Sequence, residues 1–185
     1  MEAAMDNRVK DTLQGNENYY TFENGVKTEK NSIISYAMRQ YTDNDYNFVY
    51  EVKKNAYKKY VELCWGEWNE QDQQKYFDNF INQVKDNAYI IQLENEDIGF
   101  YNGEVLESGN YEVGNICIIP EYQGRGIGSR ILKDIIDRYS NTDIEIQFFK
   151  QNPVGNLYKR LGFEKSGETQ FHYHMIMHKN IKLTK

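Results

Sequence analysis

A glycine-rich stretch in the second half of the chain constrains the fold more than any other feature. It reads IPEYQGRGIGSRIL, from Ile119 to Leu132, and its glycines stand at positions 124, 126 and 128. A strand-like run precedes it and a helix-like run follows, so the glycines predict a tight turn from a strand into a helix. The first amides of a helix lack partners within the helix, and the helix dipole adds partial positive charge there. The stretch therefore predicts a site for a phosphate group.

Two common phosphate-binding motifs fit this stretch poorly. The sequence G-x-x-x-x-G-K-[ST] occurs nowhere in the chain, which excludes a P-loop. A dinucleotide fingerprint needs G-x-G-x-x-G, and Ser129 stands where the third glycine belongs. A Rossmann site is the weaker alternative, because that fold also needs repeated βαβ units.

The hydrophobic pattern predicts the element order β αα βββ α β α ββ. We expect strands over residues 33–38, 89–93, 98–106, 111–119, 143–150, 163–166 and 171–178, and helices over 45–64, 71–84, 127–139 and 152–160. In the first helix, apolar residues from Phe48 to Leu63 should face inward, and in the second those from Tyr76 to Val84. Asn152 should cap the last helix, with Pro153 at its first position.

Length and composition indicate one globular domain. The chain has 185 residues, of which 39% are hydrophobic and 15% aromatic, enough to bury a core. Residues 1–31 are polar and predict a partly ordered N-terminal extension, and residues 32–185 form the expected domain.

Charge and cysteine content exclude several classes of protein. A net charge of −6 opposes a nucleic-acid partner, since phosphate backbones need clustered lysine and arginine. Cys64 and Cys117 are the only cysteines and lie far apart, so we expect neither a disulfide framework nor a metal site. No apolar run has the length of a signal peptide or a membrane span, so we expect a cytoplasmic protein without a membrane partner. The richness in Asn, Ile, Lys and Tyr suggests an AT-rich, bacterial genome.

Two motifs in the second half resemble those of the GNAT superfamily, the Gcn5-related N-acetyltransferases. The family signature [RQ]-x-x-G-x-[GA] appears between Gln123 and Gly128, after a lead-in of the type I-x-I-x-P-E-Y that begins at Ile116. The second motif is NPVGNLYKRLGF, from Asn152 to Phe163. The element order is also that of the family, and the resemblance covers residues 32–178.

The resemblance implies an α/β (α+β) fold with acetyl-CoA in a cleft. A mixed, mostly antiparallel sheet of about seven strands would be splayed between its fourth and fifth strands and flanked by about four helices. The residues implied to bind the cofactor are Gln123, Gly124, Arg125, Gly126, Ile127, Gly128 and Ser129 around the pyrophosphate, Ile116, Cys117 and Ile118 along the pantetheine, and Asn152, Asn156 and Tyr158 near the cofactor arm. For Asn152, a role in capping and turn formation is an equal alternative.

The implied activity is transfer of the acetyl group of acetyl-CoA to a primary amine, by direct attack in a ternary complex. Tyr158 occupies the family position of the general acid that protonates the CoA thiolate, although a tyrosine on a short helix is often core. Glu112 lies six residues before Ile118, the position at which the histone acetyltransferase branch of the family has its catalytic glutamate. It shares a face with Gly114 if no bulge intervenes. As an alternative, a chain of water molecules acts as the base. Glu112 is then only an exposed residue of the strand.

The loop between the first two helices is expected to line the acceptor site. It contains Trp65, Glu67 and Trp68, and aromatic faces with carboxylates suit a cationic amine. We expect a small amine, a polyamine-like molecule or a basic peptide as acceptor. The alternative is that the tryptophans pack the helices and the acids are solvated. His172 and His174 are interpreted as packing or solvent residues.

The sequence leaves two other classes of function open. One is a non-catalytic acyl-CoA sensor of the same fold, against which the retained Tyr158 argues. The other is a nucleotide-binding regulatory domain. A homodimer through the terminal strands is common among proteins of the family.

Overall fold

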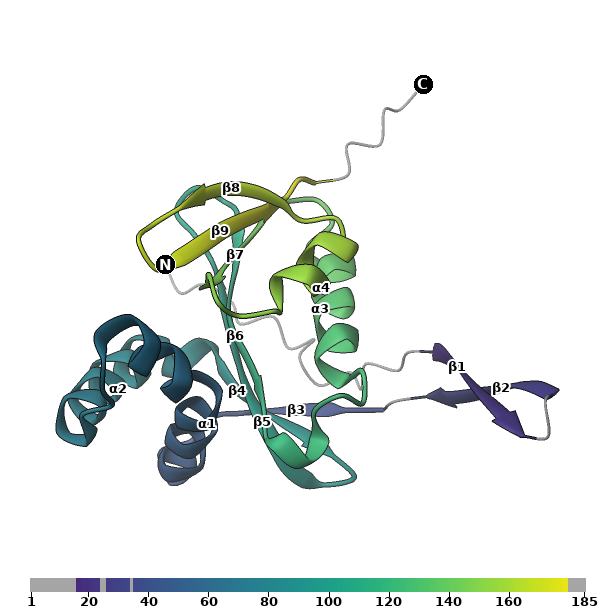
Figure 1. Ribbon diagram of the computed structural model, residues 1–185, viewed down its shortest axis with the longest axis horizontal. Helices are drawn as coiled ribbons and strands as arrows, with labels where there is room; N and C mark the ends of the chain where they lie inside the picture. The colour runs from purple at the N-terminus through teal and green to yellow at the C-terminus, as the bar shows by residue number, and fades with distance from the viewer. Residues whose placement is uncertain (1–15, 24–25, 34, 180–185) are drawn as a thin grey trace, which may run out of the picture.

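The computed structural model describes residues 16–23, 26–33 and 35–179, with side chains from residue 35 onward. A seven-stranded sheet forms its centre (Figure 1). In spatial order its strands are β3 (Ala37–Gln40), β4 (Ala88–Leu93), β5 (Glu96–Val105), β6 (Tyr111–Ile118), β7 (Ile144–Phe149), β9 (His172–Met177) and β8 (Glu164–Glu168). Within the described residues, no helix is long and apolar enough to cross a bilayer.

Four α-helices cover the two faces of this sheet. On one face lie α1 (Tyr46–Trp65) and α2 (Glu70–Val84), and on the other α3 (Ile127–Arg138) and α4 (Gly155–Arg160) (Figure 1). Asn69 caps α2 by accepting a hydrogen bond from the amide of Asp72 at 3.1 Å. The predicted order of elements from the first strand of the sheet to the last is confirmed.

The N-terminal part contains a two-stranded hairpin, β1 (Asn16–Glu23) and β2 (Val26–Ile33), which forms a separate sheet. The predicted first strand over 33–38 was therefore partly wrong. Its start, Ile33, ends β2, and the strand that joins the large sheet covers Ala37–Gln40. Residues 1–15 lie outside the described part of the chain, and the domain boundary at 31/32 stays a prediction.

The sheet separates between β6 and β7, its fourth and fifth strands in chain order. These two strands run parallel and pair through three residues only, from Tyr111 opposite Ile144 to Val113 opposite Ile146. Every other neighbouring pair in the sheet is antiparallel. Beyond Val113 the β7-facing edge of β6 is therefore not paired with β7, as expected for a splayed mixed sheet.

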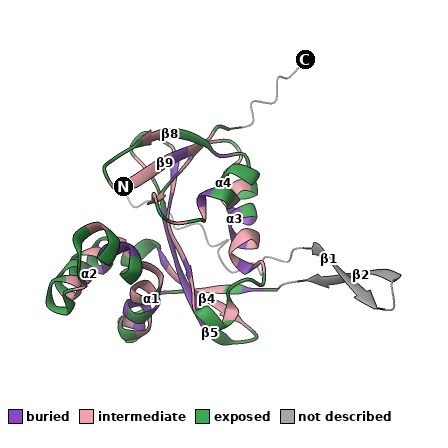
Figure 2. Cartoon of the chain, viewed as in Figure 1, coloured by how far each residue is buried: buried purple, intermediate pink, exposed green. Residues whose placement is uncertain are grey.

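Each face of the sheet has its own hydrophobic core. Ile127, Ile131 and Leu132 of α3 pack on the sheet together with Val113 of β6. On the opposite face, the core beneath α1 and α2 includes Val49, Phe77, Phe100 and Cys117. Figure 2 shows the buried residues gathered in the central strands and on the helix surfaces that face them.

A β-bulge in β6 changes which side chains face each core. Asn102 of β5 pairs with Asn115, and the next residue, Gly103, pairs with Val113, so Gly114 is an extra residue in β6. Before the bulge, Val113 faces α3. After it, Ile116 and Ile118 pack on the α3 side, and Cys117 joins the core beneath α1.

Three sequence-based details need correction. Leu63 and Tyr76 were predicted to face inward, yet they are 67% and 66% exposed. Leu63 lies in the last turn of α1, where Trp65 is also largely exposed, so the periodic stripe continues past the part of the helix that the sheet covers. The last helix begins at Gly155, because Asn152 accepts a hydrogen bond from the amide of Val154 at 3.0 Å and forms a turn before it.

Candidate active site

The glycine-rich turn joins β6 to the N-terminus of α3. Gly124 and Gly126 have φ angles of 72° and 84°, a region that favours glycine. Gly126 occupies the N-cap position without a side-chain cap, and the amide of Arg130 is the first to bond within the helix, to the Gly126 carbonyl at 2.9 Å. The three preceding amides, of Ile127, Gly128 and Ser129, are therefore left for another acceptor.

Side chains around this turn hold its shape. The Gln123 amide donates to the Ile118 carbonyl at 2.7 Å, which fixes the turn to the end of β6. Arg125 donates to the Glu121 carbonyl at 2.8 Å and lies over the Tyr122 ring. Arg130 forms an ion pair with Asp134 at 2.7 Å. Arg125 thus adds positive charge at the turn, whereas the charge of Arg130 is balanced by Asp134.

On the other side of the open sheet edge lies a cavity of about 820 Å³. Its walls come from α1, α2, β5, β6, β7 and β9, so it lies between the helix pair and the sheet where β6 and β7 part. Of the predicted acceptor residues, Trp65 and Trp68 line it and Glu67 does not. His172, interpreted from the sequence as a packing or solvent residue, lines it as well and packs on Phe149.

Both tryptophans also make structural contacts. Trp65 is 55% exposed and packs on Phe171, with ring centroids 4.7 Å apart. The indole of Trp68 donates to Glu70 at 2.9 Å, and Glu70 also accepts from Tyr50 and Lys54. These hydrogen bonds lower the pKa of Glu70 to about 2. The two tryptophans therefore line the cavity and also make contacts that hold the neighbouring elements together.

Glu112, the predicted base, lines this cavity together with Gly114. The Gly114 bulge, which the sequence argument left open, leaves both residues on the cavity side and turns Asn115 and Cys117 to that side as well. Burial raises the pKa of the Glu112 carboxyl, and the neighbouring carboxylates of Glu104 and Glu145 raise it further.

Tyr158, the predicted general acid, lies on α4. Its ring packs edge to face against Phe148, which lines the cavity, with centroids 5.2 Å apart. Burial raises the pKa of its phenol, and the nearby Cys117 contributes in the same direction. The hydroxyl therefore keeps its proton at neutral pH. Gly155 makes the packing of α4 possible, because a Cβ there would lie 2.7 Å from the Phe148 ring.

The other predicted cofactor residues follow the open edge. Ile116, Cys117 and Ile118 lie in the stretch of β6 beyond its pairing with β7. Asn152 forms the turn before α4, but Val154 and not Asn152 is the N-cap residue of that helix. Asn156 is exposed on the first turn of α4.

Sequence reasoning missed a polar cluster between α1 and the β6 bulge. The Asn115 side-chain oxygen accepts hydrogen bonds from Lys53 at 2.9 Å and from Tyr57 at 2.7 Å. The Asn115 amide donates to Asn102 at 2.7 Å, and the Cys117 thiol lies 3.5 Å from the Tyr57 hydroxyl. The signal was available, because Val49, Lys53 and Tyr57 are spaced four residues apart on one side of α1.

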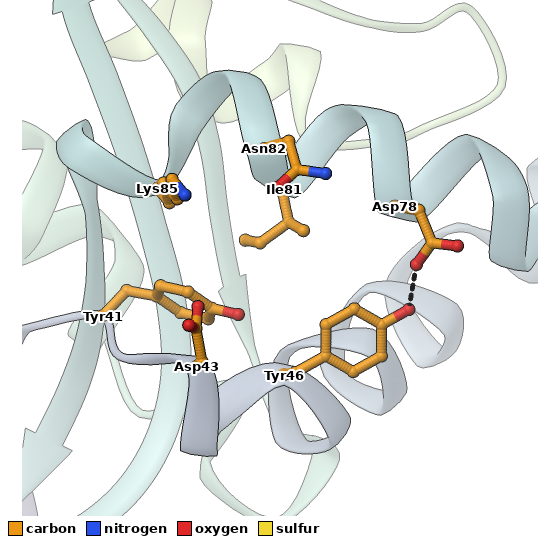
Figure 3. A pocket seen from close by; sticks show the side chains of 7 residues that line it. All are labelled: Tyr41, Asp43, Tyr46, Asp78, Ile81, Asn82 and Lys85. Atoms are coloured by element: carbon orange, nitrogen blue, oxygen red, sulfur yellow. Dashed lines mark hydrogen bonds between the residues drawn. The ribbon is translucent and has the colours of Figure 1, made fainter.

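A second cavity, of about 440 Å³, lies where the start of α1 meets the end of α2 (Figure 3). Tyr41 and Lys85 are among its lining residues, and Tyr46 donates a hydrogen bond to Asp78 across it. It contains none of the predicted site residues. Among the described residues, no group of three His, Cys, Asp or Glu side chains could hold a metal ion.

Comparison with known families explains the open edge and the glycine turn together. Residues 85–165, which run from the end of α2 to the start of β8, match the model of the acetyltransferase (GNAT) domain. This part of the chain is similar to a GNAT acetyltransferase domain. The GNAT match contains both sequence motifs, the bulge and the separation of β6 from β7.

Individual relatives agree with the GNAT assignment over most of the chain. An uncharacterised N-acetyltransferase of Methanocaldococcus jannaschii is 23% identical over 80% of this chain and 70% of its own length. A putative ribosomal protein bS18-alanine N-acetyltransferase of Bacillus subtilis is 23% identical over 74% of this chain and 86% of its own. The crystal structure of the PaiA N-acetyltransferase of Thermoplasma acidophilum, a complex with coenzyme A, has the same fold. It superposes with a TM-score of 0.59 at 19% identity, over 78% of this chain and 99% of that one.

Proposed function

We propose that this protein transfers the acetyl group of acetyl-CoA to a primary amine of a small-molecule or peptide acceptor, within a ternary complex. The observation that carries the proposal is the open edge of β6, with uncapped helix amides on one side and the large cavity on the other. Acetyl transfer needs this arrangement, because two substrates must reach one reacting carbon from different sides.

The cofactor side of the proposal rests on the glycine turn and β6. The uncapped amides of Ile127 to Ser129 suit the pyrophosphate, with Arg125 adding charge. The unpaired edge from Ile116 to Ile118 suits the amides of the pantetheine arm, which can extend a sheet edge as a strand does. Gln123 supports the turn rather than the ligand, since its amide is used by the Ile118 carbonyl.

The acceptor side of the proposal rests on the cavity lining. Trp65 and Trp68 supply aromatic surface, and Glu112 with Glu104 supplies negative charge. Two lysines line the same cavity, but Lys54 is paired with Glu70 and the pKa of Lys53 is lowered, so the lining suits an acceptor that carries an ammonium group. The similarity to a bS18-alanine N-acetyltransferase supports a peptide N-terminus as one acceptor class.

The chemistry requires two proton movements. The amine nitrogen attacks the thioester carbonyl carbon, the carbon–sulfur bond breaks, and the amine loses a proton while the thiolate gains one. We assign the first proton to Glu112, directly or through water, because its raised pKa brings it closer to neutral pH. We assign the second to Tyr158, whose phenol stays protonated. Backbone amides at the Gly114 bulge can polarise the carbonyl.

The second candidate function is an acyl-CoA sensor without turnover. The two are separated by CoA release, since a sensor binds acetyl-CoA but frees no CoA with any amine. The retained Tyr158 beside Cys117 favours the enzyme.

The test is thermal stability with acetyl-CoA, using NAD and ATP as controls, followed by CoA release with a panel of amines. A ligand at 100 times its Kd stabilises the folded state by about 2.7 kcal/mol, a rise of about 5–10 °C for a domain of this size. We expect only acetyl-CoA to raise the melting temperature by this amount. We expect CoA to be released when a cationic amine or a peptide N-terminus is the acceptor. A rise with NAD instead would overturn the proposal, and reaction only with anionic amines would overturn the acceptor class.

A further inference from the structure

The acceptor cavity contains a primary amine of the protein itself, that of Lys53. This residue lies in the middle of α1 and lines the cavity. Its ammonium nitrogen donates to the Asn115 side chain at 2.9 Å and lies 3.7 Å above the centre of the Phe80 ring. Across the described part of the chain, no carboxylate lies within ion-pair distance of Lys53, which is therefore held by neutral and aromatic groups.

The adjacent lysine provides an internal comparison. Lys54 also lines the cavity, but its nitrogen is paired with Glu70 at 2.9 Å, which raises its pKa. Burial without such a partner lowers the pKa of Lys53 to about 8. Near that pH about half of the Lys53 side chains are neutral and nucleophilic, against about 0.3% for an ordinary lysine.

The Lys53 amine also belongs to the cluster that reaches the open edge of β6. Asn115 lies directly after the Gly114 bulge and accepts from both Lys53 and Tyr57. The Cys117 thiol contacts the Tyr57 hydroxyl. Burial raises the pKa of both Tyr57 and Tyr158, and Cys117 raises it further. Hydrogen bonds therefore connect Lys53, Asn115, Tyr57 and Cys117 in one group, and Cys117 influences the pKa of the proposed general acid.

We propose that Lys53 is a self-acetylation site: the protein transfers an acetyl group from acetyl-CoA to the Lys53 nitrogen in its own acceptor cavity. The inference rests on the proposed function. Lysine has a flexible four-carbon stem, so its nitrogen can move along the open edge while the helix stays in place.

The reaction is the proposed transfer with a different amine. The neutral Lys53 nitrogen forms a bond to the thioester carbonyl carbon, the carbon–sulfur bond breaks, and CoA leaves as a thiolate. Tyr158 donates a proton to that sulfur, the Lys53 nitrogen releases one proton to solvent, and the Tyr158 phenolate takes one proton back from solvent. The products are an N-acetyl-lysine and free CoA. The new amide keeps one N–H that can still donate to Asn115, and it removes a poorly solvated charge.

Acetylation of Lys53 would slow the turnover of an external amine. The acetyl group occupies space in the cavity that the external acceptor uses, and the cation of Lys53 disappears. Acetylated protein should therefore turn over an external amine at least several-fold more slowly than unmodified protein, with acetyl-CoA binding unchanged.

The experiment incubates the full chain with acetyl-CoA and no acceptor near pH 8, and follows released CoA, intact mass and peptide mass spectra. We expect one acetyl group per chain, on Lys53, with an equal amount of CoA released. The rate should not depend on protein concentration. Lys53→Arg, which keeps a cation but cannot react, should lose the modification. The matched control Lys54→Arg should retain it.

A second variant guards against a Lys53→Arg protein that folds poorly. Asn115→Asp leaves Lys53 in place and sets a carboxylate 2.9 Å from its nitrogen, which restores the missing ion pair and raises the pKa. At the same pH, self-acetylation of Asn115→Asp should be at least tenfold slower. Thermal melting of each variant checks its folding.

Three results would overturn the inference. Acetylation spread over Lys54 and exposed lysines, or equal in heat-unfolded protein, would mean unspecific chemical transfer. An unmodified Lys53 in protein that binds acetyl-CoA and acetylates external amines would refute the inference and leave the proposed function intact. Failure of acetyl-CoA to bind at all would refute both.

Discussion

The charge of Lys53 should cost the fold measurable stability, and Lys53→Met tests this. Burial beside Phe80 and Asn115 lowers the pKa of Lys53 from its ordinary 10.5 to about 8. One pKa unit corresponds to about 1.4 kcal/mol, so holding the charged side chain in the folded state costs about 3 kcal/mol at neutral pH. Methionine has a similar length, carries no charge and can keep the contact with the aromatic ring.

The pH dependence separates this cost from other effects of the substitution. Because the folded pKa is depressed, the unfolded chain binds more protons between about pH 8 and 10.5, and wild-type stability must rise with pH in that window. Methionine does not titrate. The cost of the charge therefore falls from about 3 kcal/mol near pH 7 to about 1 kcal/mol near pH 9.5. The lost hydrogen bond to Asn115 and any change in packing are the same at both pH values and cancel.

Urea denaturation of wild type and Lys53→Met at both pH values measures this change. We expect the stability of Lys53→Met relative to wild type to decrease by about 2 kcal/mol between about pH 7 and 9.5. Lys54→Met is the matched control. The pKa of Lys54 is raised, so the stability of its pair with Glu70 is lost as pH rises, in a higher pH range. A difference between wild type and Lys53→Met that stays constant with pH would refute the argument that Lys53 is desolvated.

Three further substitutions test the proposed chemistry and the packing behind it. Tyr158→Phe should lower kcat severalfold to about a hundredfold without changing acetyl-CoA affinity, and an unchanged rate would remove the general acid. The kcat/KM of wild type should fall as pH drops through the raised pKa of Glu112, and Glu112→Gln should lose that limb of the profile; a limb that persists would exclude Glu112 as base. Gly155→Ala places a Cβ 2.7 Å from the Phe148 ring and should cost about 1–3 kcal/mol in thermal unfolding, whereas Gly167→Ala, whose Cβ meets nothing closer than 4.0 Å, should not. Equal melting of the two glycine variants would contradict the close packing.

The parts of the fold that the sequence predicted are those determined by local patterns. The long apolar stripe of α3 and the alternation at the start of β7 depend on residues near one another in the chain. The glycine turn is similar, because the positive φ angles of Gly124 and Gly126 follow from the local change from strand to helix. The start of the last helix was wrong because the side chain of Asn152 forms a turn of its own.

The features that the sequence did not predict depend on pairing between distant segments. An extra residue in β6 cannot be recognised from β6 alone, since it exists only relative to the register of β5. Lys53 was passed over because a lysine on a helix stripe usually extends its charge into water. Here Phe80 of α2 lies against the Lys53 nitrogen, so the side chain lines a cavity and does not extend into bulk water.

The Gly114 bulge connects both halves of the proposed site. Without it, strict alternation would turn Asn115 and Cys117 to the side of Val113, toward α3, and Ile116 and Ile118 toward α1. The amine of Lys53 would then meet apolar side chains in place of the Asn115 amide, and Cys117 would not contact Tyr57. The bulge also lies where β6 leaves β7, so the same residue that ends the pairing orients the polar groups beside the open edge. The proposed acceptor cavity and the proposed cofactor edge therefore depend on one register shift, and a substitution that removes it should disable both together.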